Sequence, residues 1–379
     1  MRTTTAAFLL SLTPVILATP VERCTGSISS LNDVAEAIKC TTININSFTV
    51  PAGKTFQIDA PSGATVNLLG DVTFGVAAWD GPLFVLTGTG VTCGWIFQRG
   101  LGLLLMSCIE VNGNGKTFNG QGEQYWDGLG ETGTTKPHPM MKIKSSGTFS
   151  NLVVKNSPQQ CFSFGNTAQL TVSKVTVDNS AGDNATSKSN GKAAGHNTDG
   201  FDVSVSNLTI ENCTVHNQDD CLAINQGSNI VFQGNSCTGG HGISIGSIDS
   251  GVTVSNVKIL NNVVTNNDQG LRIKTKAKAT GSTVSGITYT GNSITGCKKY
   301  GIIVDQSYPD TLGQAGNGVK ITGVNFTGTN TVAVASGAKN VEVNCGSGSC
   351  SGTWNWSGLK VSGGTKGAIN YSGITGFTL

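Results

Sequence analysis

Short runs of alternating apolar and polar residues fill the chain from about residue 43 onward. Runs such as ININSFTV, LTVSKVTV and NVKILNNVV each end in Asn, Gly or Ser. A second set of short runs recurs at Leu222, Ile243, Leu271 and Ile302, at spacings of 21, 28 and 31 residues. Period-two strands repeated every 20 to 30 residues predict a right-handed parallel β-helix, an all-β fold. A β-sandwich is the alternative, but it favours hairpin turns and evenly spaced strands, which the pattern lacks.

Asparagine-rich corners between these runs support the same architecture. Asn tolerates the left-handed backbone conformation, and its side chain can form hydrogen bonds between stacked coils. We therefore expect Asn side chains to stack from one coil to the next.

Residues 24–40 contain the one good helical pattern. Ser30 or Asn32 could cap the helix, and an apolar face is formed by Leu31, Val34, Ala35 and Ile38. A short helix at the N-terminal end would cover the exposed core of the first coil, as a solenoid requires.

One segment, Cys93 to Gly113, interrupts the short-strand pattern. Its helical periodicity is poor and its β pattern is broken, which is consistent with an insertion or with unspliced coding sequence. The regular pattern is expected to resume at Asn114.

The composition agrees with a folded, strand-rich protein. The 379 residues include 52 Gly, 37% are hydrophobic and only 12% are charged. This hydrophobic content excludes a disordered chain, and the scarcity of Glu, Lys and Leu disfavours a helical one. A net charge of +2 is too small to indicate nucleic-acid binding.

The N-terminus reads as a targeting segment. Arg2 precedes the apolar run Ala6 to Ala18, which predicts a signal peptide over residues 1–18, with a short propeptide to residue 23 as a further possibility. A membrane anchor is the alternative, but the run is too short to span a bilayer. We expect a secreted protein without a membrane partner, with residues 24–379 forming a single β-helix domain.

Eleven cysteines in a chain of this kind predict disulfides. Three short-range pairs are plausible: Cys24–Cys40, Cys221–Cys237 and Cys345–Cys350. Five others have no obvious partner, and inward-facing ones can serve as small buried hydrophobes: Cys93, Cys108, Cys161, Cys213 and Cys297. The absence of a CxxC pair or a His/Cys cluster gives no indication of a metal or another cofactor. Glycosylation sequons begin at Asn184, Asn207, Asn212, Asn325, Asn355 and Asn370.

Three aspartates are concentrated between Asn197 and Asn225. Asp199 and the adjacent pair Asp219 and Asp220 fall within 22 positions, although the whole chain has only 22 Asp and Glu residues. One coil apart, they would face each other, as two-carboxylate glycosidases require. Both members of the pair can reach one cleft only at a bend or a strand end. The alternative is that all three are turn residues, and Asp202 is expected to be structural or inward-facing.

Cationic and aromatic candidates follow on later coils. His241 is exposed by flanking glycines in GGHGISIGS, and Arg272 and Lys274 in LRIKT would share one face of a strand. Two such cations suit a carboxylate-bearing substrate, although a solvated strand edge would also carry lysines. Tyr308 could stack on a sugar or pack internally.

The order of four motifs, NTDG at 197, QDD at 218, GHG at 240 and RIK at 272, resembles that of the polygalacturonases, glycoside hydrolase family 28. The similarity includes GNGKTFNGQGEQYWDG and KYGIIVDQSY, and is greatest to fungal endo-acting members. It implies inverting hydrolysis of α-1,4-linked galacturonan without a metal.

The resemblance also implies residue roles. Asp219 would be the general acid, while Asp199 and Asp220 would hold and activate water, with His241 supporting the acid or the transition state. Arg272 and Lys274 would bind the substrate carboxylate, and Asn197 and Tyr308 would line the cleft.

Other readings stay open at this point. An exo-polygalacturonase or a rhamnogalacturonan hydrolase would share the fold, and a pectate lyase would instead eliminate, usually with Ca²⁺. A β-helical protein that binds carbohydrate without cleaving it is the non-enzymatic alternative. A monomer acting on polygalacturonan is the expectation.

Overall fold

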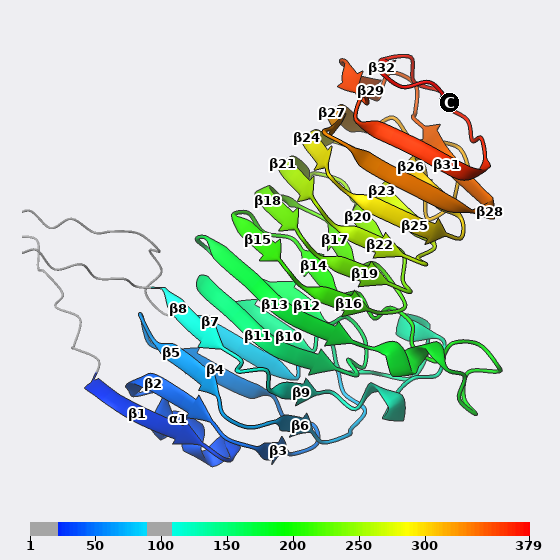
Figure 1. Cartoon of the computed structure of the whole chain (residues 1–379). Helices are drawn as coiled ribbons and strands as arrows, with labels where there is room; N and C mark the ends of the chain where they lie inside the picture. Colours follow the sequence, from blue (N-terminus) through cyan, green and yellow to red (C-terminus); the bar gives the residue numbers. More distant parts are fainter. Residues whose placement is uncertain (1–21, 89–107) are drawn as a thin grey trace, which may run out of the picture.

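The computed structural model describes residues 22–88 and 108–379. Thirty of its strands join in one sheet in which β1 pairs with β2 and the other strands pair in parallel with strands two or three positions along the chain. The predicted right-handed parallel β-helix is confirmed. Figure 1 shows the coils stacked in order, from α1 at the blue N-terminal end to the strands at the red C-terminal end.

Three rows of parallel strands run along the β-helix. The first row, which carries the candidate site, consists of β4 (Phe56–Ala60), β7 (Phe84–Gly88), β10 (Met141–Lys144), β12 (Phe162–Phe164), β14 (Phe201–Val203), β17 (Leu222–Ile224), β20 (Ile243–Ile248), β23 (Gln269–Lys276), β26 (Tyr300–Tyr308) and the later half of β28 (Asn330–Asn344).

The second row consists of β1 (Glu22–Ile28), β2 (Cys40–Ile45), β5 (Thr65–Leu68), β8 (Ile109–Asn112), β11 (Gly147–Lys155), β13 (Leu170–Asp178), β15 (Leu208–Glu211), β18 (Gly227–Gln233), β21 (Thr253–Leu260), β24 (Ser282–Thr290), β27 (Val319–Thr327) and β29 (Cys350–Ser351). The third row contains β3 (Phe48–Val50), β6 (Val72–Phe74), β9 (Thr117–Asn119), the later halves of β11 and β13, β16 (Thr214–His216), β19 (Ser236–Thr238), β22 (Val263–Thr265), β25 (Ser293–Cys297), β28 (Asn330–Asn344) and β31 (Leu359–Thr365). A separate pair, β30 (Trp354–Asn355) and β32 (Ile374–Thr375), lies near the C-terminus.

The period-two pattern of the sequence becomes the inside and outside of the coil. In β4, for example, Phe56, Ile58 and Ala60 are fully buried while the intervening Gln57 and Asp59 are exposed. Because strands stack in register, side chains of one kind meet between coils. Phe162 and Phe201, on adjacent rungs, lie with ring centroids 5.3 Å apart.

Buried asparagines connect successive coils at one corner. Asn235, Asn262, Asn292 and Asn330 form a continuous ladder, in which each Nδ2 donates to the Oδ1 of the next, at 3.1, 3.0 and 2.9 Å. Each Oδ1 also accepts the backbone N–H of the preceding ladder residue. The predicted stacking of Asn is present, and several corner asparagines, such as Asn212 and Asn261, have positive φ.

The N-terminal cap is shorter than the 24–40 pattern indicated. Residues 22–28 form strand β1, followed by a 3-10 turn (Leu31–Asp33) and the single α-helical turn α1 (Val34–Ala37). Ala37 is buried, whereas Ala35, which we expected on the apolar face, is exposed. Ser30 occupies the cap position of the 3-10 turn without a capping side-chain bond, because its hydroxyl donates to Asp33 Oδ2.

The regular pattern resumes earlier than expected. Ile109–Asn112 is the ordinary strand β8, paired with β5 and β11, so the prediction that it resumes at Asn114 was wrong. The rest of the irregular segment, residues 93–107, lies outside the described residues, as does the predicted signal peptide.

The three predicted disulfides are present, Cys24–Cys40, Cys221–Cys237 and Cys345–Cys350. Cys108 is also disulfide-bonded, although the sequence offered no obvious partner for it. Cys161, Cys213 and Cys297 are buried free thiols. Within the described ranges, no helix has the length and apolar character needed to cross a membrane.

Candidate active site

All eight predicted site residues line one cleft over the first strand row. They precede β14, β17 and β20 or lie on β23 and β26, five successive rungs. The cleft has a volume of about 580 Å³, and its lining includes Asn197, Asp199, Asp219, Asp220, His241, Arg272, Lys274 and Tyr308. The register explains this convergence, since Phe201 pairs with Leu222, Leu222 with Ile243 and Ile243 with Leu271.

The aspartate pair sits on a bend immediately before β17. This bend lets both Asp219 and Asp220 reach the cleft, as the prediction required. Cys221, the next residue, is tied to Cys237 by a disulfide. Asn217 holds the bend from below, because its Nδ2 donates to the backbone oxygens of Thr198 and Asp220 at 3.0 and 2.9 Å.

The two carboxylates have different partners. Asp219 Oδ1 accepts the backbone N–H of Asp220 at 2.8 Å, and its Oδ2 accepts Asn197 Nδ2 at 3.2 Å. Asp220 accepts the Ser244 hydroxyl at 2.7 Å and is ion-paired with Lys274 at 2.6 Å. Adjacent residues in the sequence are therefore placed in two distinct electrostatic environments.

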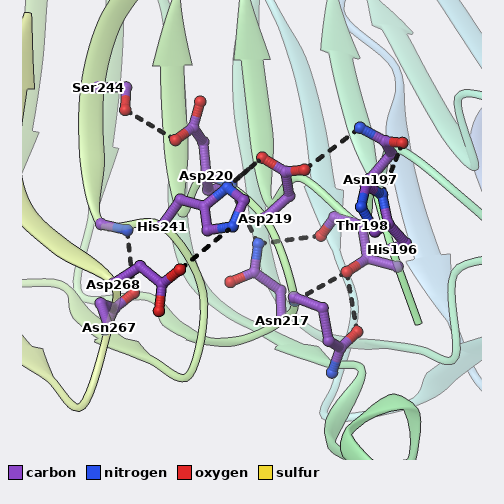
Figure 2. Close-up of polar contacts among 12 residues, drawn as sticks. His196, Asn197, Thr198, Asn217, Asp219, Asp220, His241, Ser244, Asn267 and Asp268 are labelled. Carbon is purple, nitrogen blue, oxygen red and sulfur yellow. Dashed lines mark hydrogen bonds and ion pairs between the residues drawn. The ribbon is translucent and has the colours of Figure 1, made fainter. Parts of the chain in front are cut away.

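His241 links Asp219 to the next coil (Figure 2). Its Nδ1 lies 3.0 Å from Asp219 Oδ1, and its Nε2 lies 4.0 Å from Asp268 Oδ2. Asp268 is in turn ion-paired with Lys299 at 2.7 Å. The imidazole thus stands between two carboxylates, and the outer one is balanced by a lysine.

Arg272 and Lys274 both face the cleft from β23, as their i, i+2 spacing predicted. Arg272 Nε is buried without a hydrogen-bond partner in the described part of the chain. Lys274 Nζ lies 5.4 Å from the centroid of the Tyr308 ring in addition to its ion pair with Asp220. Arg272 is therefore the cation with unused donor capacity, whereas Lys274 is already shared with a carboxylate.

Protonation is distributed unevenly among the carboxyl groups. Burial, followed by the charges of Asp219 and Asp202, raises the pKa of Asp199 well above its ordinary value. Burial and the charges of Asp220 and Asp219 raise the pKa of Asp202 to about 7. These buried acids cannot all be ionised together, so the cleft retains protons at neutral pH.

The Asp219–His241 pair shows the opposite balance. Burial alone would raise the pKa of Asp219, but the hydrogen bond and charge of His241, with the charge of Lys274, lower it to about 2. Burial lowers the pKa of His241, but the contact with Asp219 outweighs it and leaves the pKa raised. In the unliganded cleft the proton of this pair therefore resides on the imidazole.

Sequence reasoning missed several cleft residues. Asp202, expected to be structural or inward-facing, alternates with the buried Phe201 and Val203 and faces the cleft instead. Asp268 and Lys299 were not considered, although Asp268 is four residues before Arg272 and its proximity to His241 appears only after coiling. Gln269 also lines the cleft, with a buried Oε1 that has no partner among the described residues.

One group of potential metal ligands occurs among the described residues. Asp219, Asp220 and His241 offer ligand atoms within 4.8 Å of one another. However, Asp219 and His241 bind each other, and the Lys274 ammonium group already supplies a positive charge to Asp220. These donor atoms are therefore satisfied within the protein, and we assign them no metal.

Comparison with known proteins shows the family of this chain. Residues 40–375 match the model of the family described as glycosyl hydrolases family 28. The chain belongs to glycosyl hydrolase family 28. It is therefore a glycoside hydrolase, a class of enzyme that commonly uses a pair of carboxyl groups for catalysis.

Individual members are similar over most of their length. The chain is 44% identical over 342 residues to Endopolygalacturonase I of Aspergillus oryzae, covering 88% of this chain and 85% of that protein. It is 40% identical over 374 residues to a polygalacturonase of Saccharomyces cerevisiae, covering 95% and 93%. The solved structure of endopolygalacturonase I from Stereum purpureum, complexed with two galacturonate, superimposes with a TM-score of 0.83 at 46% identity, covering 92% of this chain and 98% of that one.

Proposed function

We propose that this chain is a secreted endo-polygalacturonase that hydrolyses internal α-1,4-galacturonosyl linkages with inversion of configuration. The observation that carries the proposal is the convergence of Asp219, Asp220 and Asp199 beside Arg272 and Lys274 in one cleft. Carboxylates supply the acid and base of glycosidic cleavage, and cations recognise the uronate carboxylate. The names of the similar proteins agree with this substrate.

The length of the cleft favours internal cleavage. Its lining runs from Glu131 and Gln160, before β12, to Tyr308 and Thr311, at and beyond the end of β26. Six rungs at the usual strand spacing extend over about 24 Å. A polymer can therefore lie on both sides of the aspartates, whereas an exo-acting enzyme would need a wall at one end.

In the proposed mechanism, Asp219 delivers a proton to the leaving oxygen. Because the free cleft keeps that proton on His241, 3.0 Å away, we treat Asp219 and His241 as one acid, whose proton passes through Asp219 as the glycosidic bond breaks. Asp220 and Asp199 hold and activate the water. Arg272 and Lys274 bind the carboxylate of the sugar beside the scissile bond, and Asn197 and Tyr308 line its path.

The raised pKa of Asp199 favours a second assignment of the acid. A protonated Asp199 could donate the proton, with the ionised Asp219 acting as base. An oligogalacturonosyl α-fluoride distinguishes Asp219 from Asp199 as the general acid. Fluoride leaves without being protonated, so loss of the general acid should affect this substrate little. We expect Asp219→Asn to retain most of its activity on the fluoride while losing at least about 100-fold on polygalacturonate. The reverse pattern, with Asp199→Asn retaining fluoride activity, would assign the acid to Asp199.

Secretion and a single catalytic domain over residues 24–379 are part of the proposal. The disulfides support an oxidising compartment. A monomer is proposed as the working state.

The experiment that tests the function compares turnover with binding. Asp219→Asn should abolish release of reducing ends from de-esterified polygalacturonate while polymer binding is retained. Full activity of this variant would refute the site, and binding without turnover in the wild type would indicate a non-catalytic carbohydrate-binding protein. Activity only on rhamnogalacturonan would assign the other hydrolase, and unsaturated products would indicate a lyase.

A further inference from the structure

A second cavity adjoins the catalytic cleft on its N-terminal side. It has a volume of about 390 Å³, and its lining includes Asp80, Glu131, Lys136, His138 and Gln159. Glu131 lines both the cavity and the cleft. One polysaccharide chain can therefore occupy both.

Backbone hydrogen bonds between coils fix the position of this cavity. Cys161 N–H donates to Asp199 O, Met140 N–H donates to Gln160 O, and His138 N–H donates to Asp80 O. Gln159 and Gln160 are thus one coil before Asp199, and His138 is two coils before it. At the usual strand spacing this is about 5 to 10 Å from the catalytic aspartates.

Lys136, the one lysine in the described lining of the cavity, cannot bind a ligand. The Lys136 side chain is 1% exposed, and it makes contacts of 2.9 to 3.1 Å to the Asp127 carboxylate and to the backbone oxygens of Gly130 and Thr134. A lysine ammonium group has three protons, and all three are engaged. A uronate carboxylate in the cavity would find no cation comparable to Arg272.

The cavity instead presents negative charge. Asp80 and Glu131 are exposed at its lining, and Glu131 is fixed by the Gln160 Nε2 donor at 2.7 Å and by its own backbone N–H to Asn197 Oδ1 at 3.2 Å. A carboxylate held beside a second carboxylate is repelled. The charge of the binding surface therefore changes along its length. Cations lie toward one end, namely Arg272, Lys274, Lys276 and Lys299, and carboxylates lie toward the other.

A hydrogen-bond donor is nevertheless available. Gln159 is 2% exposed, and its Nε2 is buried without a partner among the described residues. A buried donor left unpaired destabilises the protein, and a ligand acceptor would satisfy it. The ester carbonyl of an uncharged, methyl-esterified galacturonate is an acceptor of this kind, and it carries no charge for Glu131 to repel.

We propose that this cavity is a binding subsite selective for a methyl-esterified galacturonosyl residue. Glu131 excludes the free acid and Gln159 binds the ester carbonyl. The proposal deepens the proposed function and rests on it. The enzyme would thereby cleave next to an ester-bearing stretch, with a free carboxylate at Arg272 and an ester on the N-terminal side of the aspartates.

The test digests randomly and partially methyl-esterified polygalacturonate and maps ester positions in the products by mass spectrometry. Wild-type products should be enriched in ester at one fixed distance from the new chain end. Glu131→Lys should abolish this enrichment and lower KM for de-esterified polymer about fivefold. Glu131→Gln should give an intermediate result, and Gln159→Leu should reduce the enrichment.

Glu123→Lys is the matched control, because Glu123 is exposed on the same stretch of chain but lines neither cavity. An equal shift in this variant would trace the effect to net charge and overturn the proposal. Absence of ester enrichment in the wild type would also overturn it. Failure to cut de-esterified polymer at all would instead refute the proposed function.

Discussion

Lys274 Nζ lies 2.6 Å from Asp220 Oδ2, although 54 residues separate them in the sequence. The contact crosses from β23 to the bend before β17, passing the coil that carries His241 and Ser244. Burial lowers the pKa of Lys274, but the charge of Asp220 outweighs this and leaves the pKa raised, so the lysine stays charged. A substrate carboxylate bound by Lys274 must share it with Asp220.

Replacing Lys274 should therefore damage catalysis in two ways. Lys274→Met removes a substrate cation and leaves the buried Asp220 without its counter-ion, and we expect kcat/KM to fall at least about 100-fold. Lys274→Arg, which keeps the charge, should recover part of the loss. Lys258→Met on β21, whose side chain lies outside the cleft, should match the wild type. Equal activity of Lys274→Met and the wild type in steady-state kinetics would contradict this role.

Asp268 should set the basic limb of the pH profile through His241. The charges of Asp219, Asp220 and Asp268 raise the pKa of His241, so removing the Asp268 charge lowers it. His241 then loses its proton at a lower pH, so the basic limb of the kcat/KM profile of Asp268→Asn should move to lower pH. Lys299, the ion-pair partner of Asp268, partly offsets the charge of Asp268, so Lys299→Met should move the basic limb to higher pH.

Asp183→Asn provides the control for that experiment, because Asp183 pairs with a different histidine, His216, at 2.6 Å. The pH profile of this variant should be unchanged. An unmoved basic limb in Asp268→Asn would show that Asp268 does not act on His241.

Asp202 should make the protein less stable as the pH rises. Its folded-state pKa of about 7 lies above the value of about 3.9 in an unfolded chain. The native state therefore binds the proton more tightly, and the associated stability, fully present below about pH 4, is lost as the pH rises through about 7. Asp202→Asn removes this loss, so thermal unfolding should show a higher Tm than the wild type at pH 8 and little gain at pH 4. A variant less stable than the wild type at pH 8 would contradict the raised pKa.

The asparagine ladder should contribute strongly to stability. Asn292→Ala removes the acceptor of the Asn262 N–H and Nδ2 groups and the donor to Asn330 Oδ1. Leaving such buried groups unpaired should cost about 3 kcal/mol in the free energy of unfolding. Asn67→Ala, which removes one half-buried hydrogen bond to Asn44, should cost less than about 1 kcal/mol. Similar losses for both in denaturant unfolding would show that the ladder has no special role.

Local pattern predicted the fold because a β-helix repeats one simple rule. Alternating apolar and polar residues predicted the strands, and Asn and Gly predicted the corners. The bend at Asp219 and Asp220 was predicted because adjacent residues can share one cleft only at a bend. Strand β8 was missed because its four residues directly follow the irregular segment, whose composition hides the short β pattern. Strand β1 was missed because its sequence lies beside a helical pattern.

Contacts between coils could not be predicted in the same way. Asp268 lies near His241, and Lys299 pairs with Asp268, only because the intervening segments have particular lengths, and no local pattern encodes that. Asp202 was expected to be structural or inward-facing, although its alternation with Phe201 and Val203 indicates the opposite face of the strand. The inward packing of the two hydrophobic neighbours turns it toward the cleft.

The central claim, endo-acting hydrolysis of polygalacturonan, is tested most directly by one measurement. Reducing-end release from de-esterified polygalacturonate is recorded together with solution viscosity, without added calcium. We expect the viscosity to collapse while few new ends have appeared, because internal cuts shorten the polymer quickly. Accumulation of ends at nearly constant viscosity would contradict internal cleavage, and no change in either quantity with a folded sample would contradict the claim altogether.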